Sequence, residues 1–408
     1  MTKFIKNTFI IFFILIIFTS KGFSQKSIII FKTDYSNNYM NYAIYDLIIK
    51  NIFLYSNLKI MNSYSNYSSY NKIKSQIKKL TINNNANISI AYQIQNFKNG
   101  ILINYIIFDN EKPNEWIEKS AYSREEDLFI SINKILKDIY EISKIKNKIT
   151  YIKEKDYISL LGYYSQKIIL TNNEDNIYKL FYDFHKDNIY FNIDYLEYLT
   201  DKSDRTSVDI ISDLIKNMQN YINKKKNHYY LYSLGCMHYG KYKVNVILSD
   251  IEASIENYNK ALKLKNNYYK YYYRLANAYI LKNDYDNAIK YYEEAIKLNE
   301  YDINIIKEFV SLLKRDINKN GNEVISYLKK IIEINKNDEE ALEDISKLYE
   351  KIGDYDNALI YYNKLFEVIN YNLYIINNET KDADAYDRYI FKRNSIKLKI
   401  ESLNKKIF

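Results

Sequence analysis

The sequence predicts an α+β protein in which a small α/β domain with a mixed sheet precedes an all-α solenoid of repeated helices. Three observations predict this architecture. Short β-branched runs alternate with helical patterns between residues 26 and 145, and one helical segment recurs after 70 residues, from Leu275 to Ile345. The chain of 408 residues is 47% hydrophobic and holds seven glycines and one proline, so it has ample material for cores and few helix breakers.

Composition excludes several classes of protein. Three histidines and one cysteine cannot supply a disulfide framework or a set of zinc fingers. The net charge of +9 is the difference between 59 basic and 50 acidic residues, and six of the basic residues are arginines. Because bidentate contacts to phosphate and guanine favour arginine, dispersed lysine does not predict nucleic-acid binding. The 47 tyrosines belong to a general bias toward Ile, Asn, Lys and Tyr, so a single tyrosine carries little functional meaning.

Residues 1–24 have the pattern of a secretory signal peptide. A basic start precedes an uninterrupted apolar run from Phe9 to Phe18, and Gly22 and Ser24 are small residues at a cleavage position. The alternative is an uncleaved anchor, although a spanning helix needs about 20 apolar residues and Lys21 ends the run early. We expect cleavage near Ser24 and export to the periplasm or cell envelope of a bacterium. No later segment reaches spanning length, so any membrane association is expected to be peripheral.

The α/β domain begins with two strand and helix pairs. Ser27–Lys32 is a β-branched run that predicts a strand, and the helix after it has an apolar face from Ile44 to Tyr55. Leu58–Asn62 predicts a second strand. Tyr70–Leu80 predicts a second helix, because its apolar residues recur at helical spacing.

A hairpin and a third consecutive strand complete the expected sheet. Apolar and polar residues alternate from Ile88 to Ile94, which predicts a half-buried strand. Asn99 and Gly100 predict a type I′ turn, since both central residues of that turn need positive φ. The returning strand is expected at Ile101–Phe108, and the next one at Trp116–Tyr122.

Ser123 is expected to open the last helix of this domain. Its hydroxyl and the Glu126 carboxylate, three residues later, form the pattern of a capping box. Apolar residues from Leu128 to Ile139 lie on one face and predict that the helix is buried.

The order strand, helix, strand, helix, hairpin, strand, helix over residues 26–145 resembles the amino-terminal domain of TolB and its relatives. Ala86–Asn110 looks like the hairpin of that family, and Trp116–Phe129 looks like its Trp-led strand running into an acidic helix start. The family domain binds and docks other proteins without chemistry of its own. The resemblance therefore implies interaction rather than catalysis.

From Tyr269 onward the chain repeats itself at an offset of 70, close to twice a period of about 34 residues. The recurring positions are Leu275, Ala276, Tyr279, Asp284, Tyr285, Ala288, Tyr292 and Ala295, matched by Ile345, Ser346, Tyr349, Asp354, Tyr355, Ala358, Tyr362 and Leu365. These residues resemble tetratricopeptide (TPR) repeats, in which small residues let paired helices approach and tyrosine fills the gap. Four repeats are expected within residues 227–372, at about 227–268, 269–302, 303–338 and 339–372, with Lys243–Ser249 as an insertion.

The segments on either side of the repeats are also expected to be helical. Residues 150–226 continue helical faces, for example Tyr157, Leu161 and Tyr164, then Ile177, Phe181 and Phe184, and two degenerate repeats would fit there. Residues 373–408 predict a final helix that caps the open end of the solenoid. Its Lys and Arg would also suit an anionic membrane or an acidic partner, although a solvated face is the simpler interpretation.

No motif for catalysis is found in the sequence. His228, Cys236 and His238 are the one metal-like cluster, but residues 236 and 238 of a helix point to different sides, so a structural thiol and two surface histidines are expected. The alternative is an enzyme with Cys236 as nucleophile and His185 as a remote base. Nucleophile elbow, zinc, Walker and dinucleotide motifs are all missing, so we predict no enzyme activity, no metal and no cofactor.

The concave wall formed by the first helix of each repeat is the candidate binding site. An aromatic and basic groove there favours an extended peptide of acidic character. The sequence specifies neither the partner nor the oligomeric state. The residues expected to line the groove are Tyr229, Tyr232, Tyr239, Lys270, Tyr273, Asn277, Lys307, Ser311, Lys314 and Arg315.

These observations predict an exported, non-catalytic adaptor that holds protein partners in the cell envelope. The alternative function keeps the same architecture but makes the chain a periplasmic regulator, which activates an envelope or cell-wall enzyme through the α/β domain.

Overall fold

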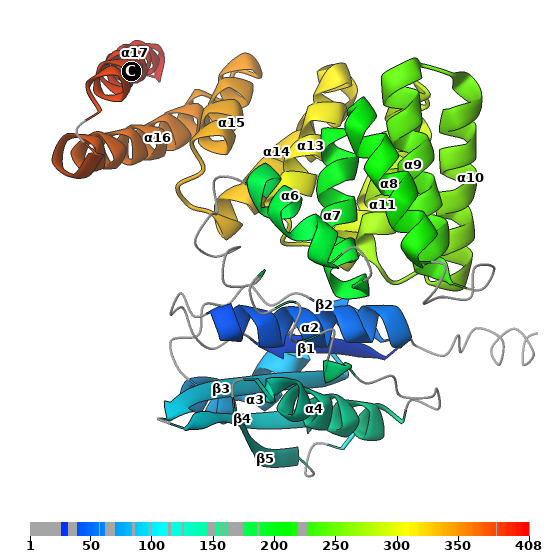
Figure 1. Ribbon diagram of the computed structural model, residues 1–408. Coiled ribbons are helices and arrows are strands. Elements are labelled where there is room, and N and C mark those ends of the chain that lie inside the picture. The colour runs from blue at the N-terminus through cyan, green and yellow to red at the C-terminus, as the bar shows by residue number, and fades with distance from the viewer. Residues whose placement is uncertain are drawn as a thin grey trace, which may run out of the picture. The chain divides into compact units, whose positions relative to one another are not determined.

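A computed structural model gives the fold of most of the chain (Figure 1). Its residues form two compact units, Met1–Arg274 and Leu275–Phe408, and each unit is described by itself. The predicted signal peptide and Pro113 lie outside the described residues. Those residues are 26–31, 39–56, 58–61, 70–83, 86–97, 99–112, 116–124, 126–144, 152–154, 157, 160, 163, 174–185, 188–218, 227–380 and 382–407.

A five-stranded mixed sheet forms the centre of the N-terminal domain (Figure 1). The strand order is β2-β1-β3-β4-β5, with β1 parallel to both of its neighbours and β3, β4 and β5 antiparallel. This sheet, followed by helical repeats, confirms the predicted fold class. The strands are β1 (Ser27–Phe31), β2 (Lys59–Met61), β3 (Ile88–Phe97), β4 (Gly100–Asp109) and β5 (Trp116–Ser123).

Three helices cover the two faces of the sheet, and they are α2 (Tyr39–Tyr55), α3 (Tyr70–Asn83) and α4 (Leu128–Ser143). On one face, α3 packs Ile73 and Ile77 against a cluster that includes Phe31 and Phe108. On the other face the Tyr105 hydroxyl of β4 donates to Asp138 of α4 at 2.6 Å. Helix α2 lies beside α4 on this second face, where the Tyr140 hydroxyl donates to Asn51 at 2.8 Å. Alternating side chains of each strand therefore enter two separate cores.

The hairpin turn is placed differently from the prediction. Gly100 is already part of β4 and pairs with Phe97, so Asn99 and Gly100 are not the central pair of the turn. Gly100 is needed for space, because a Cβ there would meet the Tyr122 hydroxyl oxygen at 2.5 Å and the backbone oxygen of Ser123 at 2.7 Å.

The predicted capping box at Ser123 is wrong. Ser123 is the last residue of β5 and pairs with Ile101 of β4, so the sheet takes the residue that the helix was expected to use. Its buried hydroxyl accepts a hydrogen bond from Ser131 of α4 at 2.9 Å. Helix α4 begins later, at Leu128, with Asp127 as the N-cap residue.

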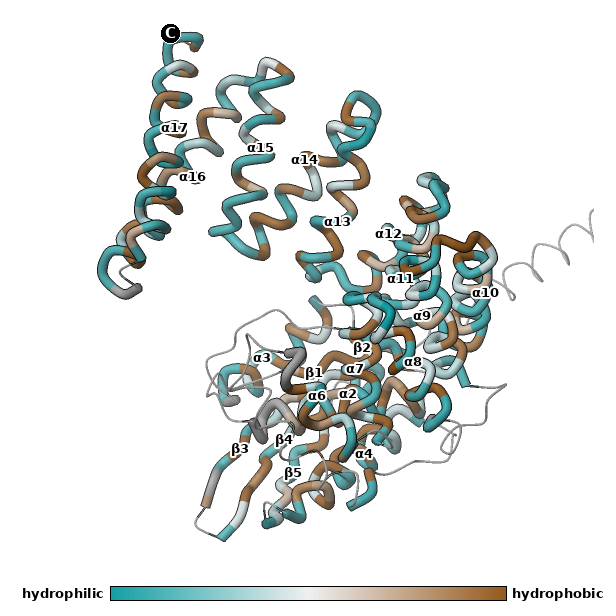
Figure 2. Tube along the Cα trace, turned by 45° about the horizontal axis from the view of Figure 1, so that its top comes forward, coloured by the Kyte–Doolittle hydropathy of each residue, from teal (hydrophilic) through white to brown (hydrophobic). Residues whose placement is uncertain are grey.

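Helices make up most of the described residues that follow the N-terminal domain. Bands of apolar residues run along the helices, with polar residues between them (Figure 2). In the first unit the helices are α6 (Glu174–His185), α7 (Ile189–Lys202), α8 (Arg205–Met218), α9 (His228–Asn245) and α10 (Leu248–Leu264). Helix α11 (Tyr269–Leu281) follows, and the second unit continues with α12 (Tyr285–Leu298), α13 (Ile303–Leu313), a 3₁₀ turn (Lys314–Asp316), α14 (Ile317–Ile334), α15 (Glu339–Lys351), α16 (Tyr355–Ile375), a π-helical turn (Ile376–Thr380) and α17 (Ala383–Ile407).

The 70-residue repetition of the sequence is repeated in the contacts. Tyr279 stacks on Tyr291 with ring centroids 5.4 Å apart, and Tyr349 stacks on Tyr361 at 5.7 Å. The two pairs have the same offset as the sequence motif. The repeated residues thus make the same helix-to-helix contact in both repeats.

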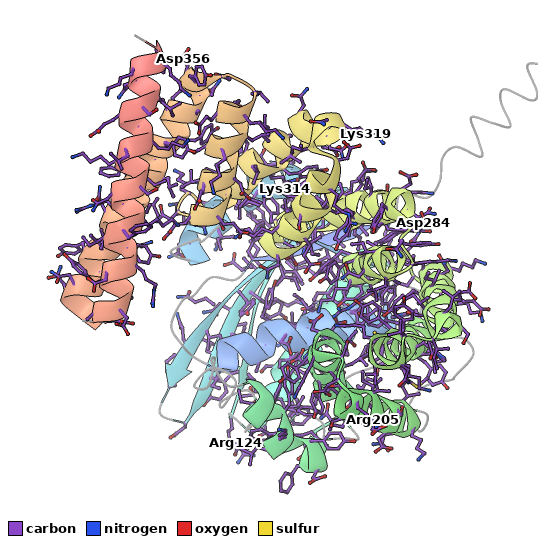
Figure 3. The ribbon with its side chains drawn as sticks, turned by 90° about the horizontal axis from the view of Figure 1, so that it is seen from above. Arg124, Arg205, Asp284, Lys314, Lys319 and Asp356 are labelled. Carbon is purple, nitrogen blue, oxygen red and sulfur yellow. The ribbon has the colours of Figure 1, made fainter. Side chains whose placement is uncertain are left out.

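Helix starts in the second unit are capped by aspartates. The Asp284 carboxylate accepts from the Asn287 backbone N–H at 3.2 Å, and the Asp354 carboxylate accepts from that of Asn357 at 3.1 Å. Asp284 is labelled in Figure 3. Such caps satisfy backbone donors that a helix start leaves free. The aspartates that recur in the motif therefore fix where α12 and α16 begin.

Residues 150–226 are helical where the structure describes them, but one expected face is different. Tyr157, Leu160 and Tyr163 are fully buried, whereas Leu161 and Tyr164 of the expected face lie outside the described residues. Phe184 was expected inside with Ile177, yet its side chain is exposed at the end of α6. That this region contains two degenerate repeats stays a prediction.

The last helix packs against the final repeat. Ile396 and Leu403 of α17 are buried. Lys392 donates to Glu339 of α15 at 2.6 Å, and Lys399 donates to Glu350 at 2.8 Å. Part of the positive charge of α17 is therefore used against the repeat itself. Among the described residues, no helix is both long and apolar enough to cross a bilayer.

Helices α9 and α10 approach each other closely at Gly235. A Cβ at this position would lie 2.4 Å from the ring of Tyr258, and that ring is fully buried. We expect Gly235→Ala to lower the free energy of unfolding by about 1–3 kcal/mol, since a packed aromatic ring has to move. Urea denaturation followed by circular dichroism measures this change.

The matched control is Gly321→Ala in helix α14. An added Cβ there meets nothing within 4 Å. Alanine in a helix is more favourable than glycine by roughly 0.5–1 kcal/mol, so this variant should be slightly more stable than the wild type. Equal effects of the two substitutions would contradict the close contact at Gly235.

Candidate functional site

The predicted groove residues Lys307, Ser311, Lys314 and Arg315 lie on α13 and the 3₁₀ turn after it, and we call them the α13 face. Its two lysines form ion pairs with acids at and after the start of α15. Lys307 lies 3.0 Å from Asp338 and donates to Glu340 at 2.8 Å. Lys314, labelled in Figure 3, forms an ion pair with Asp344 of α15. These ammonium groups therefore serve contacts between successive repeats, and much of their charge is offset before any partner arrives.

The other predicted residues of the second unit differ in exposure. Arg315 is exposed, donates to the Tyr285 hydroxyl at 2.9 Å and has its guanidinium 4.3 Å from the centre of that ring. Asn277 is half-buried and accepts a hydrogen bond from Tyr292. Ser311 is exposed. Ser311, Lys314 and Arg315 are thus the predicted groove residues of this unit that lie fully at the surface.

The predicted tyrosines of the first unit do not line a groove. Tyr229, Tyr232 and Tyr239 are buried, so their assignment to a partner-contacting wall is wrong. Lys270 and Tyr273 are half-buried. The reason lies in packing: with so many tyrosines in the chain, tyrosine takes core positions that Leu or Phe fill elsewhere.

A buried ionic cluster occupies the place of the expected groove in the first unit. The Tyr232 hydroxyl donates to Glu197 of α7 at 2.5 Å, and Arg274 donates to the same carboxylate at 2.8 Å. The Nζ atom of Lys270 lies 3.6 Å from it. Burial opposes the charged form of Glu197, but the two cations lower its pKa below the usual value. The cluster ties α7, α9 and α11 together.

The α/β domain meets the helices through an aromatic pocket around Phe53 of α2. The ring of Phe53 lies 4.2 Å from that of Tyr268 and 5.2 Å from that of His228, measured between centroids. Tyr229 and Tyr271 complete the pocket at 6.0 and 6.1 Å. We call this contact, together with Lys265, the α2 joint.

Lys265 closes the α2 joint by capping the end of α2. It is buried, donates to the backbone carbonyls of Phe53 and Ser56, and lies 4.9 Å above the Phe53 ring. The carbonyls at a helix C-terminus lack partners within the helix, and a cation there is favourable. Burial lowers the pKa of Lys265 to about 7.

His228, His238 and Cys236 all make contacts inside the fold. His228 is not at the surface as predicted: burial and the nearby Lys265 lower its pKa to about 3, and its Nδ1 bonds the Tyr271 hydroxyl at 2.6 Å. His238 is half-buried and lies 3.1 Å from Asp250. Burial raises the pKa of the Cys236 thiol to about 11, the opposite of an activated nucleophile. Over the described ranges no cluster of His, Cys, Asp or Glu has the arrangement to hold a metal ion.

A cleft of about 820 Å³ lies between α14 and α16 of the second unit. Tyr361 and Tyr371 provide aromatic walls, and Ile332 and Val368 provide apolar surface. Charged and polar groups at the rim are Lys329, Lys336, Lys364, Glu333, Glu367 and Asn337. Aromatic surface beside polar rim groups is the usual make-up of a peptide or small-ligand site.

The lysines of this cleft differ from those of the α13 face. Lys336 and Lys364 form no ion pair with a carboxylate within the described part of the chain, and Lys364 lies 4.9 Å from the Tyr361 ring centre. The Nζ atom of Lys329 lies 5.7 Å from the centre of the Tyr349 ring. Sequence reasoning missed this surface because it lies on the second helix of each repeat. Tyr371, five residues before the π-helical turn that follows α16, was the one available signal, and the structure shows it exposed.

Comparison with known proteins identifies the repeats. Tetratricopeptide repeat family models match residues 269–302 and 339–372, so the chain carries tetratricopeptide repeats at these positions. No curated protein matches the chain.

Solved structures with some likeness are tetratricopeptide proteins at low identity. A crystal structure of MamA is 22% identical, covers 40% of this chain and 91% of its own, and has a TM-score of 0.32. The structure titled "YrrB: a TPR protein with an unusual peptide-binding site" is 16% identical, with coverage of 46% and 89% and a TM-score of 0.30. At such TM-scores the likeness carries no information about function.

The buried position of Lys265 predicts a pH-dependent stability. Its pKa is about 7 in the folded protein against 10.5 for an ordinary lysine, so between these values the unfolded chain binds more protons. The free energy of unfolding should therefore rise with pH across this window, by up to about 1.4 kcal/mol per pH unit. Urea denaturation at pH 7.0, 8.0 and 9.0, followed by circular dichroism, measures the slope.

Lys265→Met should flatten this slope, because the titrating group is removed. The control is Lys263→Met, which changes an exposed lysine of the same helix and should keep the slope of the wild type. A slope that persists in Lys265→Met would assign the pH dependence to other groups.

Proposed function

We propose that this chain is an exported, non-catalytic adaptor that holds protein partners in the cell envelope through its tetratricopeptide region. The observation that carries the proposal is the pair of tetratricopeptide repeats, folded as helix pairs, with the α14–α16 cleft open beside the second of them. Repeats of this kind present extended surfaces to other proteins. The protein-interaction role follows from the repeats, and the envelope location from the amino-terminal sequence pattern.

The α14–α16 cleft fits the partner better than the α13 face does. On the α13 face, Lys307 and Lys314 are already paired with carboxylates of α15. In the cleft, Lys336 and Lys364 form no ion pair with a carboxylate of the described residues, and they lie next to tyrosine and aliphatic surface. This combination suits a peptide segment with apolar anchors flanked by acidic residues.

The test is an affinity capture from a cross-linked native envelope fraction. The cleft variant Lys336→Glu/Lys364→Glu/Tyr371→Ala changes three exposed side chains, so its helical content should match that of the wild type. We expect this variant to capture about tenfold less of one specific partner, because it lacks a central aromatic anchor and two positive charges. Mass spectrometry of the captured proteins measures the loss.

Two matched variants serve as controls for the cleft variant. Ser311→Glu/Arg315→Glu alters exposed positions of the α13 face, and Lys319→Glu alters an exposed lysine of α14 outside the cleft. Loss of the partner in the first of these with no loss in the cleft variant would move the site to the α13 face. An unchanged list of partners for both the cleft and the α13-face variants would refute the proposal that the repeats hold them.

A second candidate function is regulation of an envelope enzyme through the α/β domain. The observation that favours it is strand β5, which is at the edge of the sheet and exposes Trp116 and Tyr122. An edge strand with exposed aromatic side chains is a ready surface for another protein. If this candidate is right, Trp116→Ala/Tyr122→Ala removes one stoichiometric enzyme from the capture while the cleft variant retains it.

Export has its own test. Fusion of residues 1–60 to alkaline phosphatase, which is active only after export, should give phosphatase activity in a bacterial host. Ile14→Lys/Ile16→Lys interrupts the apolar run and should abolish that activity. Equal activity of the two fusions would overturn the proposed export.

A further inference from the structure

The connection between α9 and α10 exposes three consecutive apolar side chains. Val246, Ile247 and Leu248 are 71%, 51% and 58% exposed. Single exposed apolar residues are common on protein surfaces, but a contiguous run at a protruding turn is a mark of an interaction site. In an ordinary helix connection these positions hold polar residues and glycine.

The backbone at Val246 is held in an unfavourable conformation. Val246 ends α9 with φ 57° and ψ 36°, in the left-handed region, and its N–H donates to the Tyr242 carbonyl at 2.7 Å. Glycine and asparagine are the usual residues for such a helix end, and β-branched side chains are strained there. A β-branched side chain in this conformation is an outlier, and because it is exposed rather than packed we infer a function for it at the surface.

The turn stands at a free end of the first unit. Helix α9 begins at His228, against Phe53 of the α/β domain, and 18 residues carry it about 27 Å away. Figure 1 shows the α9–α10 connection at the end of this hairpin that is far from α2. Helices α9 and α10 have 18 and 17 residues, whereas α11 and α12 have 13 and 14. Helices α9 and α10 are thus about one turn longer, and we call residues 246–248 at their connection the tip.

A basic and aromatic collar surrounds the tip. Lys241, Tyr242 and Lys243 lie near the end of α9, and neither lysine has an ion pair with a carboxylate among the described residues. The nearby Asp250 of α10 lies against His238 instead, at 3.1 Å. The order of side chains from the tip inward matches a membrane interface. Apolar side chains at the tip suit the acyl chains, the adjacent tyrosine suits the headgroup region, and the lysines suit an anionic surface.

We propose that residues 246–248 insert into the interface of an anionic lipid bilayer and that Lys241 and Lys243 contact the lipid headgroups. Charge decides between the occupants. Three consecutive exposed apolar side chains beside two lysines without a carboxylate partner in the described part of the chain fit an anionic bilayer, which offers apolar acyl chains and negative headgroups together. This membrane contact is independent of which protein the repeats hold.

The experiment places an environment-sensitive fluorophore beside the tip of the full chain. Ser249→Cys gives an exposed thiol for the fluorophore NBD, while Cys236 is buried and stays unlabelled. With vesicles of 30% phosphatidylglycerol in phosphatidylcholine, we expect a blue shift and an emission increase of about threefold or more, as for a probe entering an apolar interface. Vesicles of phosphatidylcholine alone should bind about tenfold more weakly, because the lysines then have no anionic partner.

Three variants test the assignment. Ile247→Ser/Leu248→Ser should weaken vesicle binding about tenfold or more, since the inserted apolar surface is lost. Val246→Gly should weaken binding while raising the melting temperature, because glycine relieves the left-handed strain. This opposite pair of effects separates loss of binding from loss of folding. The control Phe391→Ser/Leu398→Ser changes exposed apolar residues of α17 and should bind as the wild type does.

Other results would overturn the proposal. A label that shows no spectral change with anionic vesicles excludes insertion. A change that survives Ile247→Ser/Leu248→Ser shows that another segment brings the chain to the vesicle. A change produced by envelope proteins in detergent, with none from vesicles, assigns the tip to a protein pocket instead of lipid.

Discussion

Helix α2 packs against the sheet on one side and against the helices on the other, and the first unit depends on both contacts. One side of the helix packs Ile44, Leu47 and Ile48 into the sheet. Its other side and its end face the helices, where Phe53 enters the aromatic pocket and Lys265 takes the free carbonyls. A buried helix end without donors would be costly, so Lys265 is required as soon as α2 is covered. The α/β domain, helices α7 to α10 and the start of α11 therefore form one compact unit.

The local patterns of the sequence predicted the elements well, and the contacts between distant segments poorly. Period-two and helical spacings located every strand of the sheet and the repeat helices, because each pattern is complete within a few residues. The capping box at Ser123 failed because pairing with β4 extends β5 by one residue, and a ladder hydrogen bond outweighs a cap. The α2 joint could not be predicted, since nothing in the sequence around Lys265 indicates that its partners lie 209 residues earlier, at Ser56.

For the candidate site, the sequence predicted the helices of the α13 face but not the state of their side chains. Lys307 lies on α13 and Lys314 on the turn after it, and both form ion pairs with acids of α15. The buried tyrosines have a related explanation. A core built from tyrosine needs an acceptor for each hydroxyl, and the chain provides buried or half-buried carboxylates: Tyr105 donates to Asp138, Tyr163 to Asp194 and Tyr232 to Glu197. Many acidic residues that resemble binding groups in the sequence are thus used inside the fold.

Residues with positive φ at the turns between helices differ in whether their residue type suits that conformation. Asn283 and Gly353, which stand at equivalent positions of two repeats, take the positive φ of their turns at 60° and 82°. Both residue types tolerate that conformation, so the repeats meet the geometric demand in the ordinary way. Val246 meets a similar demand with a β-branched side chain, although asparagine is abundant in this chain and would fit without strain. Composition therefore does not explain a valine there. Because the side chain is also 71% exposed, packing within the described residues does not explain it either, and this is the observation on which the proposed membrane contact of residues 246–248 rests.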